Sequence, residues 1–252
     1  MSKTLSAAVV AAAVFLSACG SDAGTNPGNS QPVSLAQVFS ELSLPGLSAA
    51  ASVAGGVAIP STNTLPSGCA YSAASQVFVC PPITTNGLTV TSSYALFNAA
   101  GTSLSAFDGA TIASVRVKNT VAGTVNSDGN SYTIDVQQDQ TLSGLQTNSH
   151  TLNGTSTANM TGSLKSAGSF TTHSAATITN LVIPANAVSG SYPSSGTITL
   201  DQTSAFGGGS TLTTHLVMTF NGTSKVAVTM TVGGISLSGC TIDLASATPS
   251  CS

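Results

Sequence analysis

The chain has 252 residues and a formal net charge of −3, and only 5% of its residues are charged. Globular domains ordinarily carry about a quarter charged residues, whereas here Thr, Ser, Asn and Gln supply the polar surface. Arg116 and Lys118 are the only close basic pair, so no basic patch is available to neutralise phosphates. This composition argues against a nucleic-acid partner.

The first residues have the pattern of a secretory signal. Lys3 provides a weak positive charge, and residues 5–16 form an uncharged apolar run that is too short to span a bilayer as a helix. The residues Leu16-Ser17-Ala18-Cys19 resemble the lipobox of bacterial lipoproteins. That resemblance implies removal of residues 1–18, a diacylglycerol thioether on Cys19, and an acyl chain such as palmitate on the new amino group.

The resemblance also implies a location for the protein. Several acyl chains anchor a protein almost permanently, because each buried methylene contributes about 0.8 kcal/mol and a single chain binds only marginally. Gly20 rather than Asp follows Cys19, which by analogy with enterobacterial sorting favours the outer membrane. We therefore expect a membrane-anchored protein of the bacterial envelope, on the periplasmic or the surface side. The alternative is a Cys19 that is simply buried or disulfide-bonded.

Cleavage would remove 18 of the 252 residues and leave 234, with four basic and eight acidic side chains and a net charge of −4. Residues 19–33 combine the lipidated Cys19 with a Gly-, Asn-, Ser- and Pro-rich stretch that is typical of a flexible tether. Residues 34–67 are expected to form a short helix, over 35–43, and then a loop. The apolar stripe of this helix, which we expect to pack on a sheet, consists of Leu35, Val38, Phe39 and Leu42.

Four cysteines follow the anchor: Cys69, Cys80, Cys240 and Cys251. An even number of cysteines in an oxidising compartment indicates disulfides. Three pairings exist in principle. We expect the two local ones, Cys69–Cys80 and Cys240–Cys251, because residues 69–80 fold back naturally as a hairpin. A zinc site is the alternative, although neither pair has a His beside it.

Residues 68–252 show the two-residue alternation of β-strands. Apolar residues alternate with polar ones in the segments around 88–96, 113–118, 132–137, 197–200, 212–220 and 226–232. Turn signals separate several of these segments, namely Asn98 to Gly101, Asn221-Gly222 and Gly233-Gly234. The pattern predicts an all-β domain, a single antiparallel meander of about ten strands.

A sheet with one apolar face must cover that face. We expect a strongly curved sheet or a barrel, with the 35–43 helix against its apolar side. A pair of immunoglobulin-like domains is the rival fold, but the cysteine spacings are too short for an inter-sheet bond. A membrane-spanning barrel is disfavoured, because the chain has no Trp, only 5% aromatic residues, and therefore no aromatic girdles.

Two further patterns contain residue types that can bind metal ions. Residues 126–130, which include Asp128-Gly129, resemble the start of a calcium loop but lack its distal acidic ligand, so a hairpin turn is preferred. His150, His173 and His215 are the only histidines, and a meander does not make all their strands neighbours. We expect structural histidines, no metal and no cofactor.

No pattern of catalytic residues stands out. The chain has neither a G-x-S-x-G elbow nor an S-x-x-K motif. Asp135 and Asp139 share one strand face, but four residues on a strand separate them by about 13 Å, too far for two carboxylates acting on one glycosidic bond. We expect no catalytic residues. Three Asn-x-Thr triplets, at Asn153, Asn159 and Asn221, are better explained by turn or bulge chemistry than by glycosylation.

The sequence therefore leads to three functional hypotheses. The first is a non-enzymatic envelope lipoprotein with a surface-structural or interaction role, in contact with another envelope component. The second is a carrier of an apolar ligand, because a barrel of more than about eight strands leaves interior space. The third is a hydrolase.

Overall fold

The computed structural model describes residues 65, 67–127, 130–164, 168–184, 192–207, 209, 211–244 and 248–251. Every regular element within these residues is a β-strand, which confirms the all-β prediction. The expected anchor at Cys19, the tether and the helix over 35–43 lie outside the described residues. In the described part of the chain, no helix is long and apolar enough to cross a membrane.

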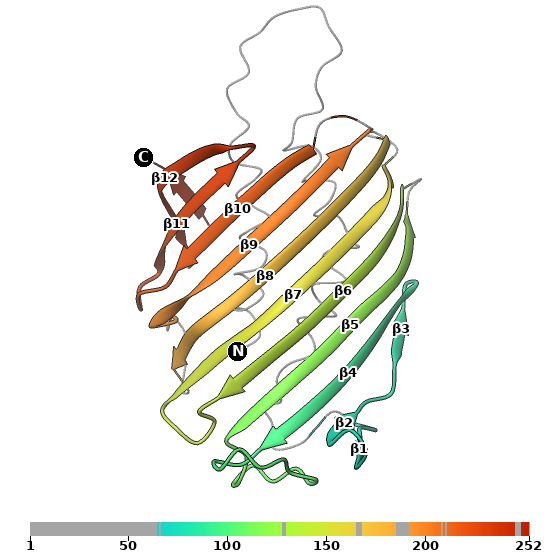
Figure 1. The fold of residues 1–252 in the computed structure, drawn as a ribbon, viewed down its shortest axis with the longest axis vertical. Coiled ribbons are helices and arrows are strands. Elements are labelled where there is room, and N and C mark those ends of the chain that lie inside the picture. Colours follow the sequence, from blue (N-terminus) through green and yellow to red (C-terminus); the bar gives the residue numbers. More distant parts are fainter. Residues whose placement is uncertain are drawn as a thin grey trace, which may run out of the picture.

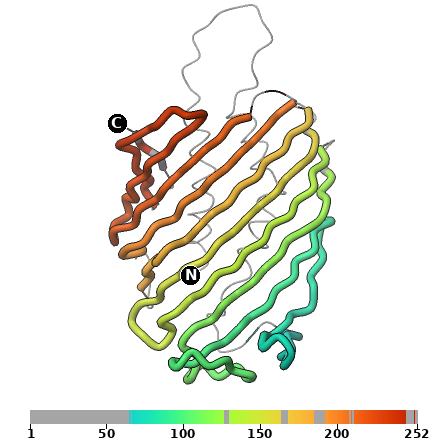
Figure 2. Tube along the Cα trace, in the orientation of Figure 1, coloured from blue at the N-terminus to red at the C-terminus, as the bar shows by residue number. Residues whose placement is uncertain are grey.

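Thirteen strands form one sheet. In chain order they are β1 (Ala70–Ser72), β2 (Val77–Val79), β3 (Ile83–Thr85), β4 (Leu88–Phe97), β5 (Ser114–Ser127), β6 (Asn130–Ser143), β7 (Ser149–Leu164), β8 (Gly168–Pro184), β9 (Ser195–Phe206), β10 (Thr211–Thr219), β11 (Lys225–Val232), β12 (Ile235–Asp243) and β13 (Thr248–Cys251). Figure 1 shows the long strands side by side with a common tilt, and Figure 2 shows the chain crossing the sheet from one edge to the other.

The predicted antiparallel meander is confirmed. The strand order is β1-β2-β4-β5-β6-β7-β8-β9-β10-β11-β12-β13, and β3 pairs with β4 beside this path. The expected count of about ten strands was too low. The alternation that predicted the other strands is weak in the two longest ones, β7 with 16 residues and β8 with 17, where Thr, Ser, Asn and Ala interrupt the apolar positions.

The sheet is open, so the barrel alternative is wrong. Among the described strands, β1 and β13 end the path, and no pairing joins them. The end strands explain this outcome, because β1, β2 and β3 have three residues each and β13 has four. Strands of this length cannot continue the ladder of the long central strands around a closed circuit. In Figure 1 the C-terminal strands turn behind β11, so the sheet is curved.

The predicted turns lie between the strands. Gly233 and Gly234 join β11 to β12 with φ values of 56° and 85°, the left-handed pair that a tight hairpin requires. The Asn98 side chain accepts hydrogen bonds from the amides of Ala100 (3.0 Å) and Thr102 (2.9 Å). The Asn221 side chain accepts one from the amide of Thr223 (3.1 Å) between β10 and β11. These local bonds set the register of the strands that follow.

One face of the sheet, here called the inner face, carries three apolar clusters. The C-terminal cluster consists of Leu142, Leu152, Leu181, Ile198, Leu216, Met218, Phe220, Val226, Val228, Met230, Cys240 and Ile242. The middle cluster consists of Leu88, Val90, Val121, Tyr132, Ile134 and Phe170. The N-terminal cluster consists of Phe78, Cys80, Tyr94, Leu96, Ile112, Val115 and Val117. Leu145 packs against both the C-terminal and the N-terminal cluster.

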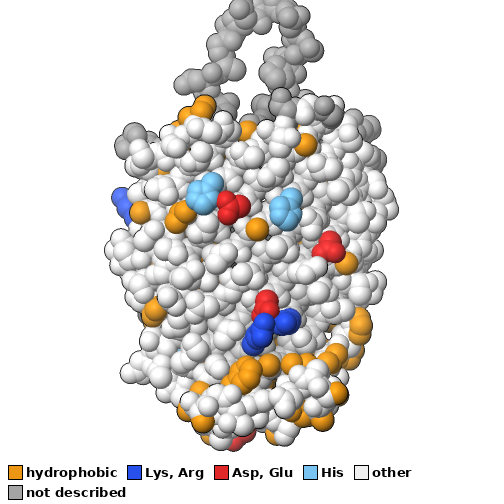
Figure 3. All heavy atoms as spheres, viewed as in Figure 1, with side chains coloured by type: hydrophobic (Ala, Val, Ile, Leu, Met, Phe, Trp, Pro, Cys, Tyr) orange, Lys and Arg blue, Asp and Glu red, His pale blue; other side chains and the backbone are white. Residues whose placement is uncertain are grey.

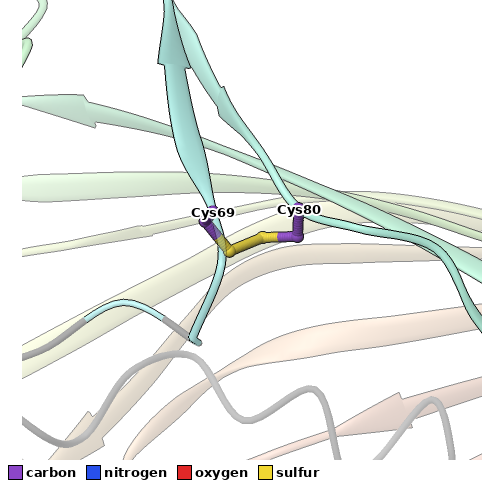
Figure 4. Close-up of a disulfide and its surroundings, with 2 residues drawn as sticks. All are labelled: Cys69 and Cys80. Carbon is purple, nitrogen blue, oxygen red and sulfur yellow. A yellow bond between two sulfur atoms is a disulfide. The ribbon is translucent and has the colours of Figure 1, made fainter.

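The predicted Cys69–Cys80 disulfide is present and joins the ends of the β1–β2 hairpin (Figure 4). The two Cα atoms lie 4.0 Å apart, and the rings of Tyr71 and Phe78 contact each other with centroids 5.2 Å apart. For the second pair, the backbone register places Cys251 opposite Cys240. The side chain of Cys251 is outside the described ones, so the Cys240–Cys251 bond stays a prediction.

Candidate functional site: the outer face of the sheet

Threonine side chains line up in rows on the face opposite the apolar clusters, here called the outer face. In one row, Thr124, Thr133, Thr161 and Thr171 lie directly opposite one another on four consecutive strands, β5 to β8. All four are exposed. The hydroxyls of Thr124 and Thr133 are hydrogen-bonded at 3.1 Å. The row therefore presents regularly spaced hydroxyl and methyl groups, one strand apart or about 4.8 Å.

Further rows run parallel to the first. Thr155, Thr177 and Thr199 are directly opposite one another on β7, β8 and β9. Other hydroxyl pairs bond across neighbouring strands: Thr91 with Thr120 at 2.6 Å, Thr84 with Thr89 at 3.1 Å, and Thr231 with Ser236 at 3.2 Å. Figure 3 shows this face as a surface with few charged side chains.

The largest charged group on the outer face consists of Arg116, Lys118 and Asp139. The Nε and Nη2 atoms of Arg116 donate to the two carboxylate oxygens of Asp139 at 2.7 and 2.6 Å, and Lys118 Nζ lies 3.5 Å from Asp139 Oδ2. The hydrogen bonds from Arg116 lower the pKa of Asp139, and the same bonds to the Asp139 carboxylate raise the pKa of Arg116. The basic pair predicted to share a strand face does so, and its charge is partly neutralised there.

Two histidines lie on the outer face, each beside a polar partner on the adjacent strand. His173 Nδ1 is 2.6 Å from Asn159 Oδ1, and His215 Nδ1 is 2.6 Å from Asp201 Oδ1. Their strands, β8 and β10, are separated by β9. Within the described residues, no group of three or more His, Cys, Asp or Glu side chains could hold a metal ion.

The other candidate residues are dispersed. Asp135 and Asp139 share the outer face, and Asp139 is occupied by its cationic partners. His150 lies on β7, apart from the other two histidines. Asp128 and Gly129 are not described, although Ser127 and Asn130 pair on either side of them, as in a two-residue hairpin. Asn153 lies at a β-bulge between β7 and β8, where its side chain accepts a hydrogen bond from the amide of Asn180 at 2.7 Å.

Sequence reasoning missed two polar groups on the inner face. Tyr94 is 1% exposed and Asn119 is 6% exposed, and neither Tyr94 Oη nor Asn119 Oδ1 has a hydrogen-bond partner. Burial also raises the pKa of Tyr94. Asn119 belongs to a row of four polar residues, with Ser92, Gln138 and Ser156. An Asn between Val117 and Val121, in the apolar phase of β5, was the signal that the sequence offered.

One shallow hollow is present at the end of the sheet where β4 leads into β5. Asn98, Leu104, Ala110 and Gln146 line it, and Gln146 Nε2 donates to the Ala110 carbonyl at 2.6 Å. The hollow is open to solvent and contains no charged side chain. Its geometry supports no particular chemistry.

No known protein family, curated protein or solved structure matches this chain. What the protein does must therefore be inferred from its own residues.

Proposed function

We propose that the protein is a lipid-anchored, non-enzymatic component of the bacterial envelope that contacts another envelope component through its outer face. The observation that carries this proposal is the set of in-register threonine rows. They span strands β5 to β10 with few charged side chains between them. The partner is a neutral, hydrogen-bonding surface.

The scarcity of charge is the informative part of this observation. Threonine is a good strand former, and threonine pairs across strands contribute about 0.2–1 kcal/mol each, so its presence alone has a structural explanation. An exposed face of this extent ordinarily carries many Lys and Glu side chains. The central part of a protein interface, in contrast, is depleted of charge. Because few aromatic side chains are present, the contact is polar and hydrated.

The anchor belongs to the same proposal. Acylated Cys19 holds the chain on the outer membrane, and the tether of residues 19–33 separates the sheet from the lipid. The Cys69–Cys80 disulfide supports a location outside the cytosol, because structural disulfides persist in oxidising compartments. The Cys240–Cys251 bond and the packing of the 35–43 helix on the inner face complete the proposed fold.

The proposed contact can be tested with two lysine substitutions in the threonine row. Thr133→Lys with Thr171→Lys puts two charges on the outer face two strands apart, about 10 Å, which avoids a directly opposed like-charge pair. The mature chain carrying Cys19→Ser, with and without these changes, is added to envelope fragments of the native host. Saturable binding is expected for the parent chain, with at least a tenfold loss for the double variant.

Thr223→Lys is the matched control, since this exposed threonine lies in the β10–β11 turn and outside the rows. It is expected to bind like the parent chain. Equal binding by all three chains, with equal melting temperatures, would contradict a contact through the outer face. Binding that is absent even for the parent chain would contradict it as well.

A carrier of an apolar ligand is the second candidate. The apolar clusters on the inner face favour it, since a curved sheet can hold an apolar ligand against such a face. Protein purified from its native host would then release about one lipid per chain into organic solvent. Release of no lipid would count against this function.

A further inference from the structure

The two histidines of the outer face share one local arrangement. Both side chains are exposed, and each Nδ1 atom lies 2.6 Å from an oxygen on the neighbouring strand: Asn159 Oδ1 for His173 and Asp201 Oδ1 for His215. A carboxylate oxygen only accepts hydrogen bonds, so Nδ1 of His215 carries the proton and donates. The amide oxygen of Asn159 accepts from His173 in the same way.

These hydrogen bonds determine what each ring offers to a partner. With the proton on Nδ1, the neutral imidazole keeps its lone pair on Nε2, which is then a hydrogen-bond acceptor only. The threonine hydroxyls around the rings can either donate or accept. Unlike the hydroxyls, each ring therefore fixes the direction of a hydrogen bond to the partner.

Both rings lie among the threonines of the outer face, where Figure 3 shows histidine side chains at the surface. Thr203 is directly opposite His173 on β9, and Thr231 is directly opposite His215 on β11. Two strands and two residues separate the Cα atoms of the histidines, a distance of about 12 Å. A partner that covers the threonine rows therefore covers both rings, and it must supply a donor to each Nε2 atom.

Asp201 is the one charged group beside either ring within the described residues. It is hydrogen-bonded to His215 and is a diagonal neighbour of His173 across β8 and β9, about 7–8 Å away between Cα atoms. The other directly opposite and diagonal neighbours of the two rings, on β7 to β11, are uncharged. Protonation of both rings therefore changes this group of three side chains from one negative to one positive charge.

We propose that His173 and His215 accept hydrogen bonds from the partner only as neutral imidazoles, so that mild acid releases the contact through the outer face. This inference rests on the proposed contact, and it names the chemistry and the regulation of that same surface. The partner presents neutral donors, such as amide or hydroxyl groups, at the two ring positions.

Protonation opposes the contact in two ways. It turns each Nε2 atom from an acceptor into a donor, which then faces the donor of the partner. It also adds charge to a surface that becomes desolvated on binding. His215 keeps its ion pair with Asp201, but Asn159 offers no opposite charge to His173. Covering an uncompensated charge is unfavourable, so the complex dissociates.

The pH dependence of binding tests this inference. Imidazole side chains change charge between about pH 5 and pH 8, so the mature chain carrying Cys19→Ser is added to envelope fragments of the native host at about pH 7.5 and about pH 5.5. Binding is expected to be at least tenfold weaker at the lower pH. Replacing both rings, by His173→Gln with His215→Gln, leaves side-chain acceptors that gain no proton in this range. This variant is expected to bind equally at both pH values, which also shows that the sheet stays folded in mild acid.

His150→Gln is the matched control, because His150 is the third histidine of the chain and lies on β7 apart from the other two. It is expected to retain the tenfold loss. Equal binding of the parent chain at both pH values would overturn this inference and leave the proposed contact intact. A tenfold loss that persists without His173 and His215, or that disappears in His150→Gln, would overturn it as well. Absence of binding at pH 7.5 would contradict the contact itself, and this inference with it.

Discussion

On the outer face, Asp139 forms ion pairs with two basic side chains, Arg116 and Lys118. Its carboxylate accepts two hydrogen bonds from Arg116 and lies 3.5 Å from Lys118 Nζ. All three side chains are partly exposed, at 46% for Arg116, 56% for Lys118 and 33% for Asp139, so solvent screens the pair. Exposed ion pairs of this kind contribute about 0–1 kcal/mol.

Asp139→Asn tests the pH dependence of this contribution. The pKa of Asp139 is lowered in the folded protein, so its stabilisation is complete above the unfolded pKa, about 3.9, and is lost as the pH falls through the lower folded value. We expect the variant to lose at most about 1 kcal/mol of unfolding free energy at pH 7, and nothing at about pH 2. Urea unfolding at both pH values measures this difference. A larger loss in acid than at neutral pH would contradict the assignment.

Gly123 is required by the close approach of two backbones. It has a φ of 152°, and a Cβ atom there would collide with the carbonyl oxygen of Gly87. Gly123→Ala is expected to lower the unfolding free energy by about 3–5 kcal/mol, through strain and overpacking together. Gly101→Ala is the control, because Gly101 also has a positive φ but has no atom within 4 Å of the added Cβ.

Gly101→Ala is expected to lower the unfolding free energy by only about 1–2 kcal/mol, because it adds only the strain of a left-handed backbone. Urea unfolding of both variants separates strain from collision. Equal losses for Gly123→Ala and Gly101→Ala would show that the collision with Gly87 is relieved at little cost.

At the scale of elements, the β1–β2 hairpin depends on its disulfide. Its strands have three residues each, and only Phe78 and Val79 of β2 pair with β4. Cys69→Ser with Cys80→Ser is expected to lower the unfolding free energy by about 2–3 kcal/mol, the entropy of an eleven-residue loop. Limited proteolysis should then cut first within residues 70–79. First cleavage elsewhere, at an unchanged rate, would contradict a stabilising role for this bond.

Strands with one strongly apolar face could be predicted from the sequence, and strands without one could not. In β10 and β11, the buried residues Leu216, Met218, Val226, Val228 and Met230 alternate with exposed or half-buried ones. In β7 only Leu152 is buried among the described side chains, and its neighbours are Thr, Ser, Asn and Gly. Neighbouring strands on both sides stabilise β7 through backbone pairing, which leaves little apolar periodicity in its sequence.

The candidate site could be predicted only in composition. The sequence shows that threonine is abundant. The alignment of Thr133 with Thr161 and Thr171, however, depends on strand register. The register depends on the lengths of the hairpin turns, which the sequence does not reveal. The pairing of Cys69 with Cys80 was predictable, because a short hairpin brings both ends together. The unpaired atoms of Tyr94 and Asn119 depend on packing, which a strand pattern does not specify.

For the whole molecule, the open sheet has edges that need protection. Short strands cover parts of both edges, and a covered edge resists pairing with other chains. Ile83 and Ile235 remain 65% and 69% exposed near the two edges. In the proposed account, the outer face contacts the envelope, and the lipid anchor at Cys19 holds the sheet outside the cytosol.

The anchor and its compartment are the central claim of this account, and native mass spectrometry of protein extracted from the host membrane tests them most directly. The account predicts a mature chain of 234 residues that starts at Cys19, with its amino terminus and sulfur acylated, its four other cysteines oxidised, and no further lipid bound. An unmodified chain that begins at Met1, is recovered from the cytosol and has reduced thiols would contradict it.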